Sequence, residues 1–101
     1  MADPMIFFCR LIPPRSDFMQ TMSDAERAIM QQHVGYWSGK VATGNAIAFG
    51  PVADPKGGYG IGIMRAENLE AMHALRDADP AVLADVGFGY EIAVMPRIVL
   101  A

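Results

Sequence analysis

The amino-acid sequence predicts an α+β fold of the ferredoxin-like sandwich type (βαββαβ), in which helices cover one face of a sheet. Two observations support this prediction. Segments of strand and helix character follow one another in the order strand, helix, strand, strand, helix, strand. Capping and turn residues also stand at the expected ends of these segments. We therefore expect the 101 residues to form a single domain, with its core at about residues 5–96.

The first strand is expected at Met5–Ile12, where nearly every residue is apolar. Such a run is typical of a strand that is covered on both faces, so this strand should be central in the sheet. Pro13 and Pro14 end it, because neither can donate a hydrogen bond to a neighbouring strand. A loop from Arg15 to Met22 follows.

The first helix begins at Ser23-Asp24-Ala25-Glu26, a capping box whose serine and glutamate side chains bind free backbone N–H groups. It should run from Ser23 to about Ala42 and end at Gly44-Asn45, residue types that tolerate a left-handed backbone. At about 100° per residue, one arc of this helix is apolar, and His33 lies near its middle. The members of that arc are Ile29, Met30, Trp37 and Val41.

The remaining elements follow from turn and cap residues. A hairpin of two strands is expected at Ala46–Ala53 and Tyr59–Arg65, because residues 54–58 have turn chemistry. A second helix should run from about Glu67 to Asp77. Asp79-Pro80 then opens a short helical turn, with aspartate as its N-cap. The last strand is expected at Phe88–Met95.

Composition excludes several classes of function. The net charge of −3 and the lack of a basic run argue against nucleic-acid binding. The single cysteine, Cys9, excludes an intramolecular disulfide and a metal site built on several thiolates, which favours a reducing compartment. The first apolar run is too short for a signal sequence or a membrane span. We therefore expect a cytoplasmic protein without a membrane or nucleic-acid partner.

An apolar fraction of 52% exceeds what a lone domain of this size can easily bury. Helices on one side of the sheet also leave its other face open, although the first strand is apolar on both faces. A second copy of the chain would cover that face most economically. The predicted partner is therefore the chain itself, in a homodimer or a higher oligomer.

His33 and Asp79 are the predicted catalytic residues. Histidine has an unperturbed pKa of about 6.5, close to the value that a general base needs. Asp79 could accept a hydrogen bond from one ring nitrogen and leave the other nitrogen basic. The alternative is structural: a lone histidine among apolar residues is often a hydrogen-bonded core residue, and an aspartate before proline is explained as a helix cap.

Five further residues are candidates for binding a small-molecule substrate, each with a structural alternative. Trp37 could wall a pocket or belong to the core, and Phe18 could close a lid or pack on a partner subunit. Gly50 and Pro51 could shape a pocket rim or simply bend the strand. Gly60 leaves room for a ligand or for close packing against a helix. The Gly58-x-Gly60-x-Gly62 pattern is not a nucleotide site, because it lies on a strand and not between a strand and a helix.

Several segments together resemble the YCII-related (YciI-like) proteins over roughly residues 5–96. These segments are His33-Val34-Gly35-Tyr36-Trp37, Phe49-Gly50-Pro51-Val52-Ala53-Asp54-Pro55, Gly58-Tyr59-Gly60-Ile61-Gly62, Asp79-Pro80 and Tyr90-Glu91-Ile92. The resemblance implies a single YCII-related domain, a dimeric α+β barrel, and a histidine and aspartate pair that maps onto His33 and Asp79. It also implies kinship with isomerases, monooxygenases and eliminating enzymes. The Pro13-Pro14-Arg15 loop is longer than in the shortest relatives.

The leading hypothesis is a cofactor-free acid/base enzyme, an isomerase or an eliminating lyase, that acts on a small oxygenated cyclic or carbonyl compound. No metal site is predicted. Two alternatives stay open: a module that binds a small metabolite without converting it, and a structural homo-oligomer with a filled core. An RNA-binding sheet ranks last, because the third strand offers only one tyrosine and one arginine.

Overall fold

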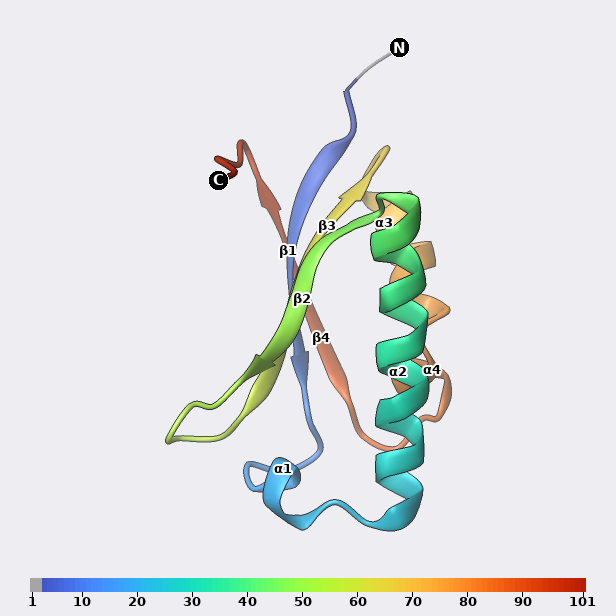
Figure 1. Cartoon of the computed structure of the whole chain (residues 1–101), viewed down its shortest axis with the longest axis vertical. Helices are drawn as coiled ribbons and strands as arrows, with labels where there is room; N and C mark the ends of the chain where they lie inside the picture. The colour runs from blue at the N-terminus through green and yellow to red at the C-terminus, as the bar shows by residue number, and fades with distance from the viewer. Residues whose placement is uncertain (1–2) are drawn as a thin grey trace.

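The computed structural model describes residues 3–101 as four strands and four helices (Figure 1). The strands form one antiparallel sheet in the order β2-β3-β1-β4, which is the ferredoxin-like arrangement. The elements are β1 (Met5–Ile12), α1 (Phe18–Thr21), α2 (Asp24–Thr43), β2 (Ala46–Val52), β3 (Tyr59–Ala66), α3 (Leu69–Asp77), α4 (Pro80–Leu83) and β4 (Gly89–Met95). The predicted fold class and the central position of β1 are thus confirmed.

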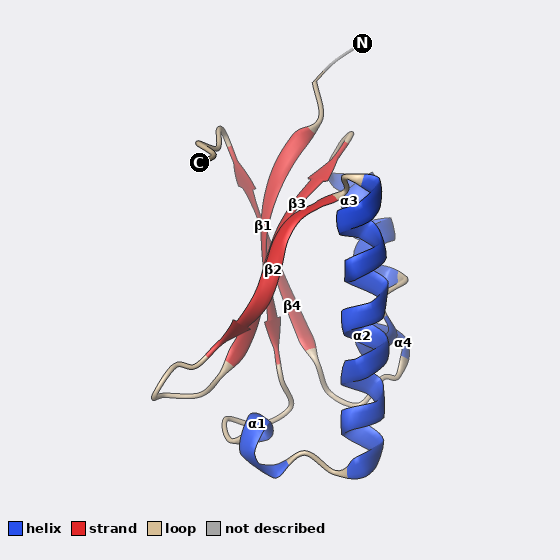
Figure 2. Ribbon diagram, viewed as in Figure 1, coloured by secondary structure: helices blue, strands red, loops and turns tan. Residues whose placement is uncertain are grey.

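Helices α2, α3 and α4 lie on one side of the sheet, and no helix of residues 3–101 covers the other side (Figure 2). Strand β1 therefore presents two different surfaces. Phe7, Cys9 and Leu11 are buried beneath the helices, whereas the alternate residues Ile6 and Phe8 remain partly exposed. The sheet thus has a helix-covered face and an open face.

The core lies between the covered face and helices α2 and α3. Its buried members are small and large apolar side chains of strands and helices: Phe7, Cys9, Trp37, Ala46, Met64, Ala66 and Met72. The pairing register brings Cys9 opposite Gly62 on one side and opposite Ile92 on the other. No helix within residues 3–101 has the length and apolar character needed to cross a membrane.

Local capping explains where α2 begins and ends. The Ser23 hydroxyl accepts a hydrogen bond from the Glu26 N–H at 3.1 Å, and the Glu26 carboxylate accepts one from the Ser23 N–H at 2.9 Å. Gly44 has φ +88°, the left-handed C-cap that the sequence predicts. Val41 departs from the prediction, because it is 45% exposed. It lies about 80° around the helix from His33, at the edge of the buried arc.

Two further features differ from the sequence prediction, the start of one helix and the presence of another. Helix α3 begins at Leu69, because Asn68 is its N-cap and accepts a hydrogen bond from the Ala71 N–H at 2.8 Å. The loop before α2 contains a short helix, α1, that the sequence analysis does not predict. Figure 1 shows α1 past the C-terminal end of β1.

Candidate active site

His33 and Asp79 are in direct contact. Nδ1 of His33 lies 2.9 Å from each carboxylate oxygen of Asp79. His33 stands near the middle of α2 and is 9% exposed, while Asp79 is fully buried at the N-cap of α4. Because a carboxylate can only accept hydrogen bonds, neutral His33 carries its proton on Nδ1. Its Nε2 lone pair is then left for a ligand.

Asp79 also receives hydrogen bonds from three other donors. The Trp37 indole N–H donates to Oδ2 at 2.7 Å, and the Tyr90 hydroxyl donates to the same atom at 3.3 Å. The backbone N–H of Ala81 donates to Oδ1 at 2.8 Å, so Asp79 caps α4 as predicted. The two interpretations of Asp79, as a helix cap and as the partner of His33, therefore hold together.

These contacts set the charge of Asp79. Burial raises the pKa of its carboxyl group, but the hydrogen bonds from His33 and Trp37, with the Ala81 N–H, outweigh burial and hold the pKa below its usual value. Burial and the nearby Asp79 charge raise the pKa of the Tyr90 phenol. At neutral pH Asp79 is therefore ionised and Tyr90 keeps its proton.

A cavity of about 340 Å³ lies beside His33, between α2, the α1 segment and the covered face of the sheet. Six of the seven predicted site residues line it: Phe18, His33, Trp37, Gly50, Pro51 and Gly60. Asp79 does not line it and lies behind His33. The remaining wall is mostly apolar and includes the side chains of Met19, Met22, Met30 and Met64.

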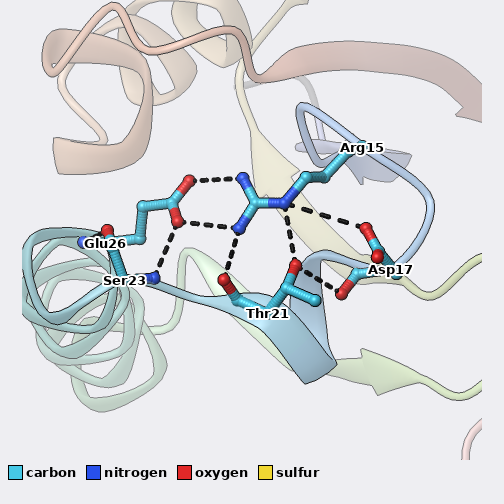
Figure 3. A network of polar contacts seen from close by, with 5 residues as sticks. All are labelled: Arg15, Asp17, Thr21, Ser23 and Glu26. Atoms are coloured by element: carbon cyan, nitrogen blue, oxygen red, sulfur yellow. Dashed lines mark hydrogen bonds and ion pairs between the residues drawn. The ribbon is translucent and has the colours of Figure 1, made fainter.

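Residues 15–22, which contain α1 and are called here the α1 segment, form one end of this cavity through Phe18, Met19 and Met22. Phe18 is 3% exposed and packs edge-to-face against Phe88, with ring centroids 5.2 Å apart. Arg15 anchors the segment to α2 through two hydrogen bonds to the Glu26 carboxylate, at 2.8 and 2.9 Å (Figure 3). It also binds the hydroxyl and the carbonyl oxygen of Thr21. Arg15 and the Ser23 N–H lower the pKa of Glu26 to about 2.

Gly60 and Gly62 both line the cavity. Of the two alternatives stated for Gly60, close packing against a helix is wrong. The nearest neighbours of a side chain at either position belong to strands. A Cβ at Gly60 would lie 3.4 Å from Cβ of Leu11, which is ordinary contact. At Gly62 it would overlap the terminal methyl group of Met64, so this methionine fills the space above the glycine.

The sequence analysis did not predict a role for Tyr90, and it gave Trp37 only the roles of a pocket wall or a core residue. The sequence did contain part of the information needed to place Tyr90. Side chains alternate between the two faces of β4, which puts Tyr90 on the covered face, opposite Leu11. A fully buried aspartate also needs several donors, which nearby Trp and Tyr side chains supply. Within residues 3–101, no group of three or more His, Cys, Asp or Glu side chains is placed to hold a metal ion.

Comparison with known proteins identifies the family. The family model described as the YCII-related domain matches residues 6–96. A search of curated proteins gave no match. The matched range includes the whole helix that carries His33, the cap residue Asp79 and all four strands, apart from Met5. The chain thus belongs to the YCII-related domain family.

Proposed function

We propose that this protein is a cofactor-free acid/base enzyme, an isomerase or an eliminating lyase, that acts on a small oxygenated cyclic or carbonyl compound. The substrate would occupy the cavity beside His33, with Trp37, Phe18, Gly50, Pro51 and Gly60 around it. The observation that carries this proposal is the bond from His33 Nδ1 to a buried, ionised Asp79. Because Cys9 is a buried free thiol, the proposed location is the reducing cytoplasm.

In the proposed reaction, His33 Nε2 removes a proton from a carbon next to a carbonyl group. The electron pair of the broken C–H bond moves into an enolate, and the ring becomes an imidazolium ion that the Asp79 carboxylate stabilises. Return of the proton to a different carbon gives an isomer. Departure of a leaving group from the adjacent carbon gives an elimination product, and Nε2 then releases its proton to solvent.

Proton exchange tests this proposal without knowledge of the natural substrate. The protein is incubated in D₂O with a panel of cyclic ketones, and NMR measures the replacement of the acidic C–H protons by deuterium. His33→Asn should lower any catalysed rate about 100-fold or more. His73→Asn is the matched control and should leave the rate unchanged. Equal rates for wild type and His33→Asn would exclude His33 as the base.

A binding module without turnover is the second candidate. The observation that favours it is the nearly apolar cavity wall, which offers a ligand few polar contacts besides His33. Recovery of a bound compound unchanged after long incubation, together with no proton exchange, would support this candidate. A structural subunit with a filled core is disfavoured, because the cavity beside His33 is open.

The proposed partner is a second copy of the chain, packed on the open face of the sheet to give the dimeric α+β barrel. Apolar side chains of three strands gather there and remain partly exposed: Ile6, Phe8, Ile12, Ile61, Ile63 and Met95. Arg10 and Glu91 form an ion pair of 3.3 Å among them. Burial of such a face against an identical one would remove this apolar surface from water.

A further inference from the structure

Among the described residues, the side chains that line the cavity beside His33 include no acidic or basic residue other than His33 itself. No lysine, arginine, aspartate or glutamate lines it. Two of its polar side chains, Trp37 and Tyr90, already direct their protons at Asp79. The ring of Tyr59, which is also in the lining, stacks against Arg10 of the open face, with the guanidinium carbon 4.3 Å from the ring centroid. His33 is therefore the main polar side chain that a ligand would meet there.

The charge behind His33 is negative. The His33–Asp79 pair has a net charge of −1 when the imidazole is neutral and zero when it is protonated. In neither state does the site carry a net positive charge that could balance an anion. A ligand carboxylate inside this cavity would lose its water without gaining a cationic partner, which is strongly unfavourable.

The size and lining of the cavity favour a small apolar ring system. Its volume of about 340 Å³ is near the lower end of the roughly 300–1,000 Å³ usual for small-molecule sites. Four methionine side chains, Met19, Met22, Met30 and Met64, line it. Methionine is flexible and polarisable, so such a wall adapts to flat rings of somewhat different outline.

We propose that this cavity selects neutral, largely apolar molecules of one or two rings, with a single polar group that meets His33, and rejects their carboxylate analogues. This inference rests on the proposed function, because it assigns the substrate class of the same site. It concerns equilibrium binding, so it can be measured independently of turnover.

Two probes of the same shape test it. 2-Naphthamide and 2-naphthoate differ in one terminal atom and in charge, and isothermal titration calorimetry at pH 7.5 measures the binding of both. We expect the amide to bind and the carboxylate to bind at least about 10-fold more weakly. Equal or tighter binding of 2-naphthoate would overturn the proposal. So would the absence of binding by 2-naphthamide.

A cation placed on the wall should change this preference. Met30→Lys puts an ammonium group three residues before His33 on α2, in a position that lines the cavity. It should raise the affinity for 2-naphthoate relative to 2-naphthamide. Gln31→Lys adds the same charge at an exposed neighbouring position and should leave the ratio unchanged. Equal ratios in the two folded variants would contradict the proposal, and the wild-type comparison decides it if Met30→Lys does not fold.

NMR signals of the two histidines of the chain can show where the probe binds. NMR signals of the His33 imidazole should shift when 2-naphthamide is added, and those of His73, which does not line the cavity, should not. The two proposals fail separately. Selective amide binding with no effect of His33→Asn on proton exchange would contradict only the proposed chemistry, whereas normal exchange with equal amide and carboxylate binding would contradict only the charge selectivity.

Discussion

Trp37 donates its indole N–H to Oδ2 of Asp79 at 2.7 Å, and His33, one turn earlier on α2, contacts the same oxygen atom at 2.9 Å. A single buried anion therefore orients two neighbouring side chains of the helix that line the cavity. The sequence suggested Trp37 only as a cavity wall or a core residue. Its N–H instead makes it a positioning residue for the carboxylate that holds His33.

Trp37→Phe should destabilise the protein by about 2–3 kcal/mol, because it removes a hydrogen bond to a buried charged acceptor while keeping an aromatic ring in the wall. Urea unfolding followed by circular dichroism measures the change. Tyr90→Phe is the comparison. Its hydrogen bond to Asp79 is longer, 3.3 Å, so its loss should cost only about 1 kcal/mol. The reverse order of the two effects would contradict this account of Asp79.

Protonation of Glu26 at acid pH should lower the stability of the folded protein. Its pKa falls from 4.5 to about 2 in the folded protein, chiefly because Arg15 binds its carboxylate. A group with a lowered folded pKa contributes stability that is complete above its unfolded pKa and is lost as the pH falls through the folded one. The melting temperature of wild type should therefore approach that of Glu26→Gln between pH 4.5 and 2. A difference in melting temperature between wild type and Glu26→Gln that stays constant over that range would contradict this role of Arg15.

The order of elements could be predicted from sequence because short-range chemistry determines it. Ser23 and Glu26 mark the start of α2, Gly44 marks its end, and Asp79 begins α4. The places of His33 on α2 and of Asp79 at the N-cap of α4 could be predicted for the same reason, since each follows from the helix that carries it. What brings them together is the packing of α2 on α4, which no local pattern encodes.

The parts that sequence could not predict depend on tertiary packing. Tyr90 reaches Asp79 only because β4 pairs with β1 in the observed register, opposite Leu11. Helix α1 has only four residues and depends on Arg15 and on the contact between Phe18 and Phe88. A helix of this length is not stable alone in water. Its sequence therefore contains little information from which the helix could be predicted.

The open face of the sheet should determine the oligomeric state. Ile63→Lys places a charge opposite Phe8, in the middle of the apolar face. If a second copy packs there, this substitution should convert a dimer into a monomer at the same concentration, as measured by analytical ultracentrifugation. Leu83→Lys is the control, because Leu83 is 68% exposed on α4, away from the sheet. A monomeric wild type would contradict the proposed dimer.

Gly62→Ala should shrink the cavity without unfolding the protein. The added Cβ would overlap the flexible end of Met64, which can swing aside, and the adjacent free space is the cavity that both residues line. We expect weaker binding of 2-naphthamide at nearly unchanged melting temperature. Gly35→Ala is the control: a Cβ there meets nothing within 4 Å, and Gly35 does not line the cavity, so its affinity for 2-naphthamide should equal that of wild type. Equal affinities for Gly62→Ala and wild type would show that Met64 moves elsewhere.

Cys9 should react slowly in the folded protein and more slowly still when the cavity is filled. Burial raises the pKa of its thiol from 9.0 to about 11, and the thiolate is the form that attacks disulfide reagents. At pH 8 this shift alone should slow its reaction with Ellman's reagent roughly 100-fold relative to the unfolded chain.

Because Cys9 also lines the cavity, 2-naphthamide should reduce its reaction rate further, in proportion to the occupied fraction. The chain unfolded in guanidinium is the control, since the same ligand should have no effect on its rate. Native and unfolded protein reacting at equal rates would contradict the burial of this thiol. A slow native rate that 2-naphthamide leaves unchanged would instead place the ligand away from Cys9, on the outer part of the cavity.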